Sequence, residues 1–235
     1  MLTNYSHYIF DLDGTLVNST HEIFKAAKST CEKNNLGIPD FEYFKTRVGM
    51  HPGIFFKDHG AKENIDYLIQ EFREILFHQA GDKSLVFEGV LEFLQLIKKN
   101  KLRISLATTK PTFLAKKLIP KYGLENYFSH IQGTEDNIRP KPYPDMILKC
   151  ISLSKNNCVV MIGDSLSDML AAEAAGIDCI GVCTGACSRS QLEDTKAKIV
   201  VNDLTELEHF RVEGNYLSGF IPESICDLDI DYDDY

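Results

Sequence analysis

Short apolar runs alternate along this chain with longer stretches in which apolar residues recur every three or four positions. The apolar runs predict strands at 7–10, 103–107, 128–132, 159–162, 179–182 and 198–201. The helical period predicts helices at 20–34, 62–80, 88–100, 111–122, 143–153, 165–175 and 203–210. Apolar strands that alternate with helices favour an α/β fold, in which a parallel sheet is covered on both faces.

This alternation is interrupted after the first strand. No strand signal occurs between about 16 and 85, where two helical stretches flank a loop at 48–53 that is broken by Gly and Pro. We interpret residues 18–85 as an inserted all-helical domain, and residues 1–17 with 86–213 as the core that contains the sheet. Residues 214–235 hold six acidic side chains and no basic one, which indicates a separate acidic C-terminal tail.

Charge narrows the classes of function. The 235 residues include 34 acidic and 25 basic side chains, a formal net charge of −9. A nucleic-acid groove needs clustered Lys and Arg, and anionic membranes attract basic segments, so we expect neither partner. Without the six acids of the tail, the formal net charge is −3. This charge does not exclude a small anionic substrate.

The apolar runs and the cysteines indicate where in the cell the protein is expected. No run approaches the ~20 apolar residues that span a bilayer, and the first residues lack the basic and apolar regions of a signal peptide. The seven cysteines lie mostly in apolar runs, as is typical of reduced thiols, so we expect a cytoplasmic protein. Cys179, Cys183 and Cys187 have a spacing that permits a metal cluster, but their run reads better as a strand entering a turn.

The first of four polar motifs is DLDGT, which follows the first predicted strand. Asp11 and Asp13 stand two residues apart, and one carboxylate can face a pocket while the other swings in from the loop if the chain turns directly after the pair. Gly14 permits that turn. Paired acids suit a nucleophile or metal ligand beside a proton donor, although Asp-x-Asp also occurs in solvated turns.

Two further motifs supply a hydroxyl and a cation. Thr108, Thr109 and Lys110 follow the strand at 103–107, where a hydroxyl and backbone N–H groups either hold an anion or simply cap a helix. Lys141 stands between two prolines in RPKPYPD, which predicts a cation held in an extended segment. Such a lysine suits a phosphate, and its alternative is a solvated basic turn.

The fourth motif is GDSLSD, which follows the strand at 159–162. Asp164 and Asp168, one helical turn apart, can converge on a Mg²⁺ ion, or Asp164 can serve only as a helix cap. Ligands of an open parallel sheet bind beyond the carboxyl ends of its strands, where these motifs are expected to meet. Together they match phosphoryl transfer, which needs charge neutralisation and alignment.

With these motifs in this order, the sequence resembles the haloacid dehalogenase superfamily, in its phosphoglycolate phosphatase-like branch with a helical cap. The matching pieces are DLDGT, ATT, RPKPYPD and GDSLSDMLAAEAAG, and the resemblance covers about residues 5–210. It implies a Rossmann-like core and a Mg²⁺-dependent phosphatase. The implied substrate is a small phosphomonoester, either phosphoglycolate-like or a sugar phosphate.

The resemblance also implies catalytic roles. Asp11 would attack phosphorus and form an aspartyl-phosphate, and Asp13 would protonate the leaving oxygen and then activate water. Thr108 would bind the transferring phosphoryl group. Lys141 would neutralise its charge and hold Asp11.

The implied metal site uses residues of the first and fourth motifs. Mg²⁺ would be bound by Asp11, by the backbone carbonyl of Asp13 and by Asp164. Asp168 would contact Lys141 or a metal-bound water.

Four more residues are candidates for substrate contact. Gly14, Thr109 and Lys110 flank the expected phosphate cradle. Arg47 lies in the predicted loop of the inserted helical domain and suits a carboxylate or a second phosphate, although an Arg near a helix end more often faces solvent. We expect the inserted domain to close over the site and exclude water.

Three other functions stay open. A phosphomutase of this superfamily carries a hydrophobic residue where Thr15 stands, so Thr15 favours hydrolysis. A pyrophosphatase would use the same site. A non-catalytic binding or regulatory protein on this scaffold is disfavoured by the intact set of site residues. We expect a monomer or weak dimer, and the sequence does not fix the physiological substrate.

Overall fold

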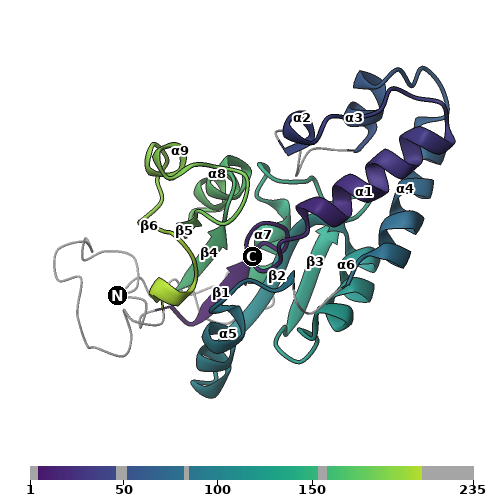
Figure 1. The fold of residues 1–235 in the computed structure, drawn as a ribbon. Coiled ribbons are helices and arrows are strands. Elements are labelled where there is room, and N and C mark those ends of the chain that lie inside the picture. Colours follow the sequence, from purple (N-terminus) through teal and green to yellow (C-terminus); the bar gives the residue numbers. More distant parts are fainter. Residues whose placement is uncertain (1–4, 46–51, 82–84, 153–157, 208–235) are drawn as a thin grey trace.

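Six parallel strands form one sheet in the computed structural model, which describes residues 5–45, 52–81, 85–152 and 158–207. The strands are β1 (His7–Phe10), β2 (Arg103–Pro111), β3 (His130–Thr134), β4 (Val159–Gly163), β5 (Asp178–Val182) and β6 (Ile199–Val201). Their order across the sheet is β3-β2-β1-β4-β5-β6 (Figure 1). The predicted α/β fold with a parallel sheet is therefore confirmed.

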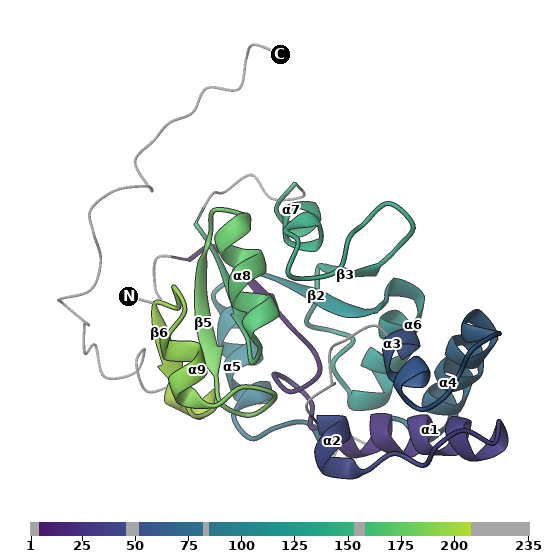
Figure 2. The same ribbon diagram turned by 90° about the horizontal axis from the view of Figure 1, so that it is seen from above.

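Helices cover both faces of the sheet, as the apolar strands require. Tyr8 and Phe10 point to the face covered by α5 (Val90–Lys99) and α6 (Thr112–Leu118), which continues into the 3₁₀ turn η3 (Ile119–Tyr122). Ile9 and Met161 point to the face covered by α7 (Asp145–Ile151) and α8 (Leu166–Ala174). The short helix α9 (Arg189–Glu193) packs beside β5 and β6 (Figure 2).

The end of β2 differs from the prediction. The strand was expected to stop at 107 and the next helix to begin at 111, but β2 continues to Pro111 and α6 begins at Thr112. After an irregularity in the register, Pro111 pairs with Thr134 of β3. The two β-branched threonines suit this extension, because their side chains fit a pleated, buried surface.

Among the described residues, four helices lie between β1 and α5, and Figure 1 shows them grouped beyond the carboxyl end of β1. They are α1 (Thr20–Lys33), α2 (Phe41–Lys45), α3 (Pro52–Asp58) and α4 (Ile65–Gln79), here called the helical segment. The long pair α1 and α4 matches the predicted helices. The predicted loop at 48–53 is wrong at its end, because Pro52 and Gly53 belong to α3; proline suits the first turn of a helix, where its missing N–H costs nothing.

Two backbone contacts join the two ends of the helical segment to each other where the chain enters and leaves it. Val17 and Val86 form a bridge, and the N–H of Asn18 donates to Leu85 O at 2.7 Å. The buried apolar side chains of the helical segment belong to the same continuous cluster as Tyr8 and Phe10.

Two sequence predictions lie outside the described residues: Arg47 with most of its loop, and the acidic tail. None of the cysteines in the described ranges forms a disulfide. Among the helices that the structure describes, none combines the length and the apolar character needed to cross a bilayer.

Candidate active site

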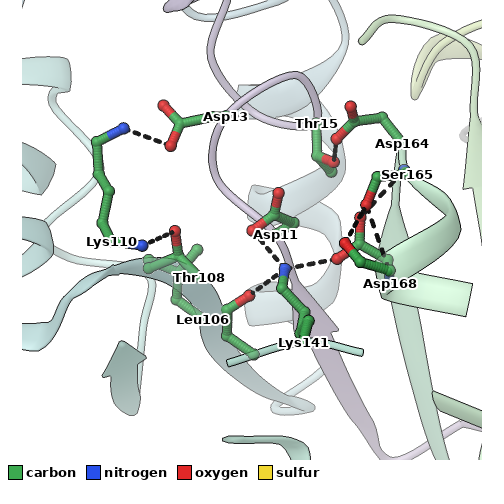
Figure 3. Close-up of polar contacts among 12 residues, drawn as sticks. Asp11, Asp13, Thr15, Leu106, Thr108, Lys110, Lys141, Asp164, Ser165 and Asp168 are labelled. Atoms are coloured by element: carbon green, nitrogen blue, oxygen red, sulfur yellow. Dashed lines mark hydrogen bonds and ion pairs between the residues drawn. The ribbon is translucent and has the colours of Figure 1, made fainter. Parts of the chain in front are cut away.

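The polar motifs meet where the strand order reverses. From β1 the chain steps to β2 and β3 on one side, and then returns to β4, β5 and β6 on the other. Asp11 directly follows β1, and Asp164 directly follows its neighbour β4. Such a reversal leaves a crevice at the carboxyl edge of a sheet. Figure 3 shows the motif side chains converging there.

Lys141 is the centre of the contacts in this crevice. Its Nζ lies 2.7 Å from Oδ1 of Asp11 and 2.5 Å from Oδ1 of Asp168 (Figure 3). It also lies 2.9 Å from the carbonyl oxygen of Ala107. An ammonium has three hydrogens, so all of its donors are used. The side chains of Lys141 and Asp168 are buried, which makes their ion pair stronger than one exposed to water.

Asp168 is fixed by the helix on which it lies. Its Oδ2 accepts from the N–H of Ser165 at 3.1 Å and from the Ser165 hydroxyl at 2.5 Å, and its own N–H donates back to that hydroxyl. This reciprocal capping box begins α8. Both oxygens of Asp168 are therefore engaged, one by Lys141 and one by Ser165.

Asp164 is also held from two sides. The hydroxyl of Thr15 donates to Oδ1 at 2.7 Å, and the N–H of Ala186 donates to Oδ2 at 2.7 Å. Side-chain oxygens of Asp11, Asp164 and Asp168 all lie within 4.8 Å of one another. The first and fourth motifs thus form one cluster of carboxylates.

This cluster holds more negative than positive charge. Three buried carboxylates surround the single ammonium of Lys141. Burial raises the pKa of Asp11 well above its ordinary value, and burial with the charge of Asp168 raises the pKa of Asp164 to about 7. Burial alone would lower the pKa of Lys141, but the charges of Asp11 and Asp168 outweigh it and raise the pKa. Hard oxygen donors with unbalanced negative charge fit a divalent cation such as Mg²⁺.

Asp13 lies apart from this cluster, at the side of the crevice. The ammonium of Lys110 binds its Oδ2 (Figure 3). The hydroxyl of Ser19 donates to its Oδ1. The side chains of Asp13 and Lys110 are both largely buried. Gly14, which has a φ of +86°, makes the turn expected directly after the two acids.

The remaining predicted residues lie around the same crevice, except Arg47, which is outside the described residues. Thr108 is buried, and its hydroxyl accepts from the N–H of Lys110 at 3.3 Å. Thr109 follows on β2 and is half-buried. A Cβ at Gly14 would overlap the Asp164 carboxylate, so glycine is needed there for space as well as for its φ.

Direct contacts to these residues also come from positions that carried no site prediction, among them Ser19, Ser165, Thr184 and Ala186. Ser165 has a visible signal, since Ser-x-x-Asp before an apolar run is a capping pattern. Thr184 and Ala186 follow β5, one strand beyond Asp164 at the same edge of the sheet. Ser19 carries no local signal, because its contact with Asp13 depends on the turn between them.

Comparison with known proteins agrees with this architecture. Residues 8–182 match the sequence profile of the haloacid dehalogenase-like hydrolases. The phosphoglycolate phosphatase of Chromobacterium violaceum is 32% identical over 84% of this chain and 92% of its own length. That of Yersinia pestis is 31% identical over 75% and 80%.

Solved structures share the fold at lower identity. A haloacid dehalogenase-like family protein from Streptococcus pneumoniae superposes with a TM-score of 0.77 at 22% identity, over 88% of this chain and 99% of that one. CbbY from Rhodobacter sphaeroides, solved with phosphate, has a TM-score of 0.75 at 19% identity, over 86% and 96%. The chain described above belongs to the haloacid dehalogenase-like hydrolase family.

Proposed function

We propose that this protein is a Mg²⁺-dependent phosphatase that hydrolyses small phosphomonoesters through an aspartyl-phosphate on Asp11. The main support is that only one of the two oxygens of the Asp11 carboxylate is hydrogen-bonded. Lys141 occupies Oδ1, whereas Oδ2 has no hydrogen-bond donor within the described part of the chain. In Figure 3 that second oxygen points to the space between Asp13 and Thr15. An oriented carboxylate with one oxygen available is what attack on phosphorus requires.

The proposed reaction has two steps. An Asp11 oxygen attacks phosphorus, the bond to the leaving oxygen breaks, and Asp13 gives that oxygen its proton. Asp13 then takes a proton from water, whose oxygen attacks the phosphorus of the aspartyl-phosphate. Phosphate leaves and the Asp11 carboxylate is restored. Thr108 and Lys141 hydrogen-bond and neutralise the phosphoryl group during both steps.

For the metal we propose Asp11, Asp164 and the backbone carbonyl of Asp13 as ligands. Asp168 belongs to the same carboxylate cluster, but Lys141 and Ser165 already bind its two oxygens, so we assign it to orienting Lys141. The bound ion would supply positive charge to the phosphoryl oxygens. The excess of buried negative charge in this cluster supports the assignment.

We propose the helical segment, with residues 18–85 as its limits, as a cap that selects the substrate. Phosphoglycolate-like acids and sugar phosphates are the leading classes, and two relatives bear the name phosphoglycolate phosphatase. Lys110, Thr109, Gly14 and Arg47 are the proposed contacts to the substrate. Lys110 has the strongest support, because its ammonium binds Asp13, the residue proposed to protonate the leaving oxygen.

Phosphate release from a panel of small esters and from pyrophosphate, with Mg²⁺ or with EDTA, tests the proposal. We expect Mg²⁺-dependent release that Asp11→Asn lowers by roughly 10³-fold or more, because it replaces the nucleophile. Asp66→Asn makes the same change at an exposed position of α4 and should keep full activity. Equal release by wild type and Asp11→Asn would refute the mechanism.

Other outcomes of this panel identify the alternatives. A strong preference for pyrophosphate would favour the pyrophosphatase, and a sugar phosphate isomerised without phosphate release would favour the mutase. No turnover of any ester by protein that binds Mg²⁺ would favour a binding or regulatory role.

A further inference from the structure

The loop that follows β5, residues 183–187 and here called the β5 loop, is packed directly on Asp164. The N–H of Ala186 donates to the Asp164 side chain at 2.7 Å, and the N–H of Cys187 donates to its backbone carbonyl at 3.1 Å. At the start of the loop, the N–H of Cys183 donates to Val201 of β6 at 3.0 Å. The β5 loop is thus anchored to the sheet and binds both the main chain and the side chain of Asp164.

The same loop also holds the turn of the first motif. The hydroxyl of Thr184 donates to the carbonyl of Gly14 at 2.6 Å. A Cβ built on Gly185 would lie 2.8 Å from Cα of Gly14, so the two backbones are in close contact. Gly14 lies between Asp13 and Thr15, and Thr15 binds the other oxygen of Asp164. Asp164 is therefore enclosed by two loops that also contact each other.

Gly185 leaves no room for a side chain on the inner side of this loop. A Cβ there would overlap Oδ2 of Asp164, the oxygen that accepts from Ala186. Gly185 is not among the glycines with positive φ, so the left-handed backbone gives no reason for it. Glycine is required at 185 by the space that the Asp164 carboxylate occupies, and also by the close approach of the Gly14 backbone.

We infer that Gly185 is a positioning residue of the proposed metal site: by leaving space for the Asp164 carboxylate, it lets Ala186 and Thr15 fix the orientation in which Asp164 binds a divalent cation. The inference rests on the proposed function. Groups that orient metal ligands commonly change metal affinity by 10- to 100-fold when they are altered. Gly185 would act on the cation through Asp164, without touching the substrate.

Calorimetric titration of the metal-free full-length protein with Mg²⁺ tests this inference. We expect Gly185→Ala to weaken Mg²⁺ binding by roughly tenfold or more, because the new methyl group displaces the Asp164 carboxylate. Gly37→Ala is the matched control: that glycine is also exposed and also lacks a positive φ, and its Cβ would meet nothing closer than 3.4 Å. Its Mg²⁺ affinity should equal that of wild type.

Two further measurements separate positioning from a general loss of structure. The thermal midpoint in EDTA should change much less for Gly185→Ala than the midpoint in saturating Mg²⁺, since the defect concerns the bound cation. Thr184→Val removes the hydroxyl that holds Gly14 and should raise the Mg²⁺ concentration for half-maximal phosphate release. Thr184→Ser keeps the hydroxyl and should restore the wild-type value, with the KM for the ester unchanged in both at saturating Mg²⁺.

Different results would refute the positioning role of Gly185 and the proposed metal site. If wild type binds Mg²⁺ and Gly185→Ala binds it equally well, the positioning role is refuted and the metal site stands. If wild type binds no Mg²⁺, the proposed metal site is refuted, and the role of Gly185 with it.

Discussion

The ammonium of Lys141 lies 2.7 Å from the carboxylate of Asp11, a residue 130 positions earlier in the chain. Two separate motifs, one after β1 and one before α7, are joined by this single contact. Because Lys141 also binds Asp168, one cation connects three of the predicted motifs through charge. The loss of Lys141 should therefore affect both stability and chemistry.

Lys141→Met keeps the length of the side chain and removes its charge. Three buried carboxylates would then lack their cation, and removing one partner of a buried ion pair costs about 3–5 kcal/mol of unfolding free energy. Phosphate release should fall by roughly 100-fold or more, since the phosphoryl charge loses a buried counter-charge. Urea unfolding in EDTA and kcat measured with Mg²⁺ check the two effects. Unchanged kcat in a folded variant would exclude Lys141 from the chemistry.

Lys110→Met tests the cation beside Asp13. Lys110 and Ser19 each bind one oxygen of the Asp13 carboxylate, so removal of the ammonium frees it to rotate. We expect kcat to fall by roughly 10- to 100-fold, less than the full contribution of proton transfer, because Asp13 itself remains. Mg²⁺ affinity should not change, because Asp13 is proposed to offer the metal only its backbone carbonyl.

Lys116→Met, an exposed lysine of α6, is the control for Lys110→Met and should keep wild-type kinetics. Wild-type kcat in Lys110→Met would remove Lys110 from the site. A fall in Mg²⁺ affinity would instead show that Lys110 acts on the metal site and not on Asp13 alone.

Much of the sheet could be predicted from the sequence, because most of its strands contain a short apolar run bounded by polar turns. The motifs at strand ends also gave the edge at which the site lies, since parallel strands share one carboxyl edge. The family and the fold are confirmed. The roles of the site residues, the domain limits, the compartment and the oligomeric state stay predictions.

Other features could not be predicted from the sequence, because the elements are too short to show a pattern or depend on contacts between distant parts of the chain. The helices α2 and α3 have five and seven residues, too few for a helical period to stand out. The extension of β2 to Pro111 depends on pairing with Thr134, a contact between elements. The β5 loop can donate hydrogen bonds to Asp164 because β5 lies beside β4. This neighbourhood is known only once the strand order is known.

Glu22 joins the base of the helical segment to the body of the protein. Its two carboxylate oxygens accept from the N–H of Gly81 and from the hydroxyl of Tyr122, each at 3.0 Å. Glu22→Ala would leave both donors without this acceptor, and a lost partner of a part-buried group costs about 1–3 kcal/mol. Glu22→Gln keeps one carbonyl acceptor and should lose less.

Urea unfolding measures this ranking, with exposed Glu63→Ala as a control that should match wild type. If Glu22→Ala were as stable as Glu63→Ala, the contact between α1, Gly81 and η3 would contribute nothing to stability.

His7 makes stability depend on pH. It is fully buried on β1, where Nε2 bonds the hydroxyl of Ser105 at 2.8 Å, and Nδ1 has no hydrogen-bond partner within the described part of the chain. Burial, with the charges of Arg103 and His130, lowers the pKa of His7 from 6.5 to about 4. His7 therefore binds a proton below about pH 6.5 in the unfolded chain, but only below about pH 4 in the folded protein.

The stability contributed by neutral His7 is thus complete above pH 6.5 and is lost as the pH falls toward 4, by about 3 kcal/mol in all. His7→Asn cannot titrate in this range but retains a polar group for Ser105. We expect the difference in unfolding free energy between wild type and His7→Asn, measured by urea unfolding in EDTA at pH 7.5, 6, 5 and 4.5, to shift steadily in favour of the variant at acid pH. Because all other titrating groups are common to both proteins, a difference that stays constant across this range would mean that folded His7 titrates as it does in the unfolded chain.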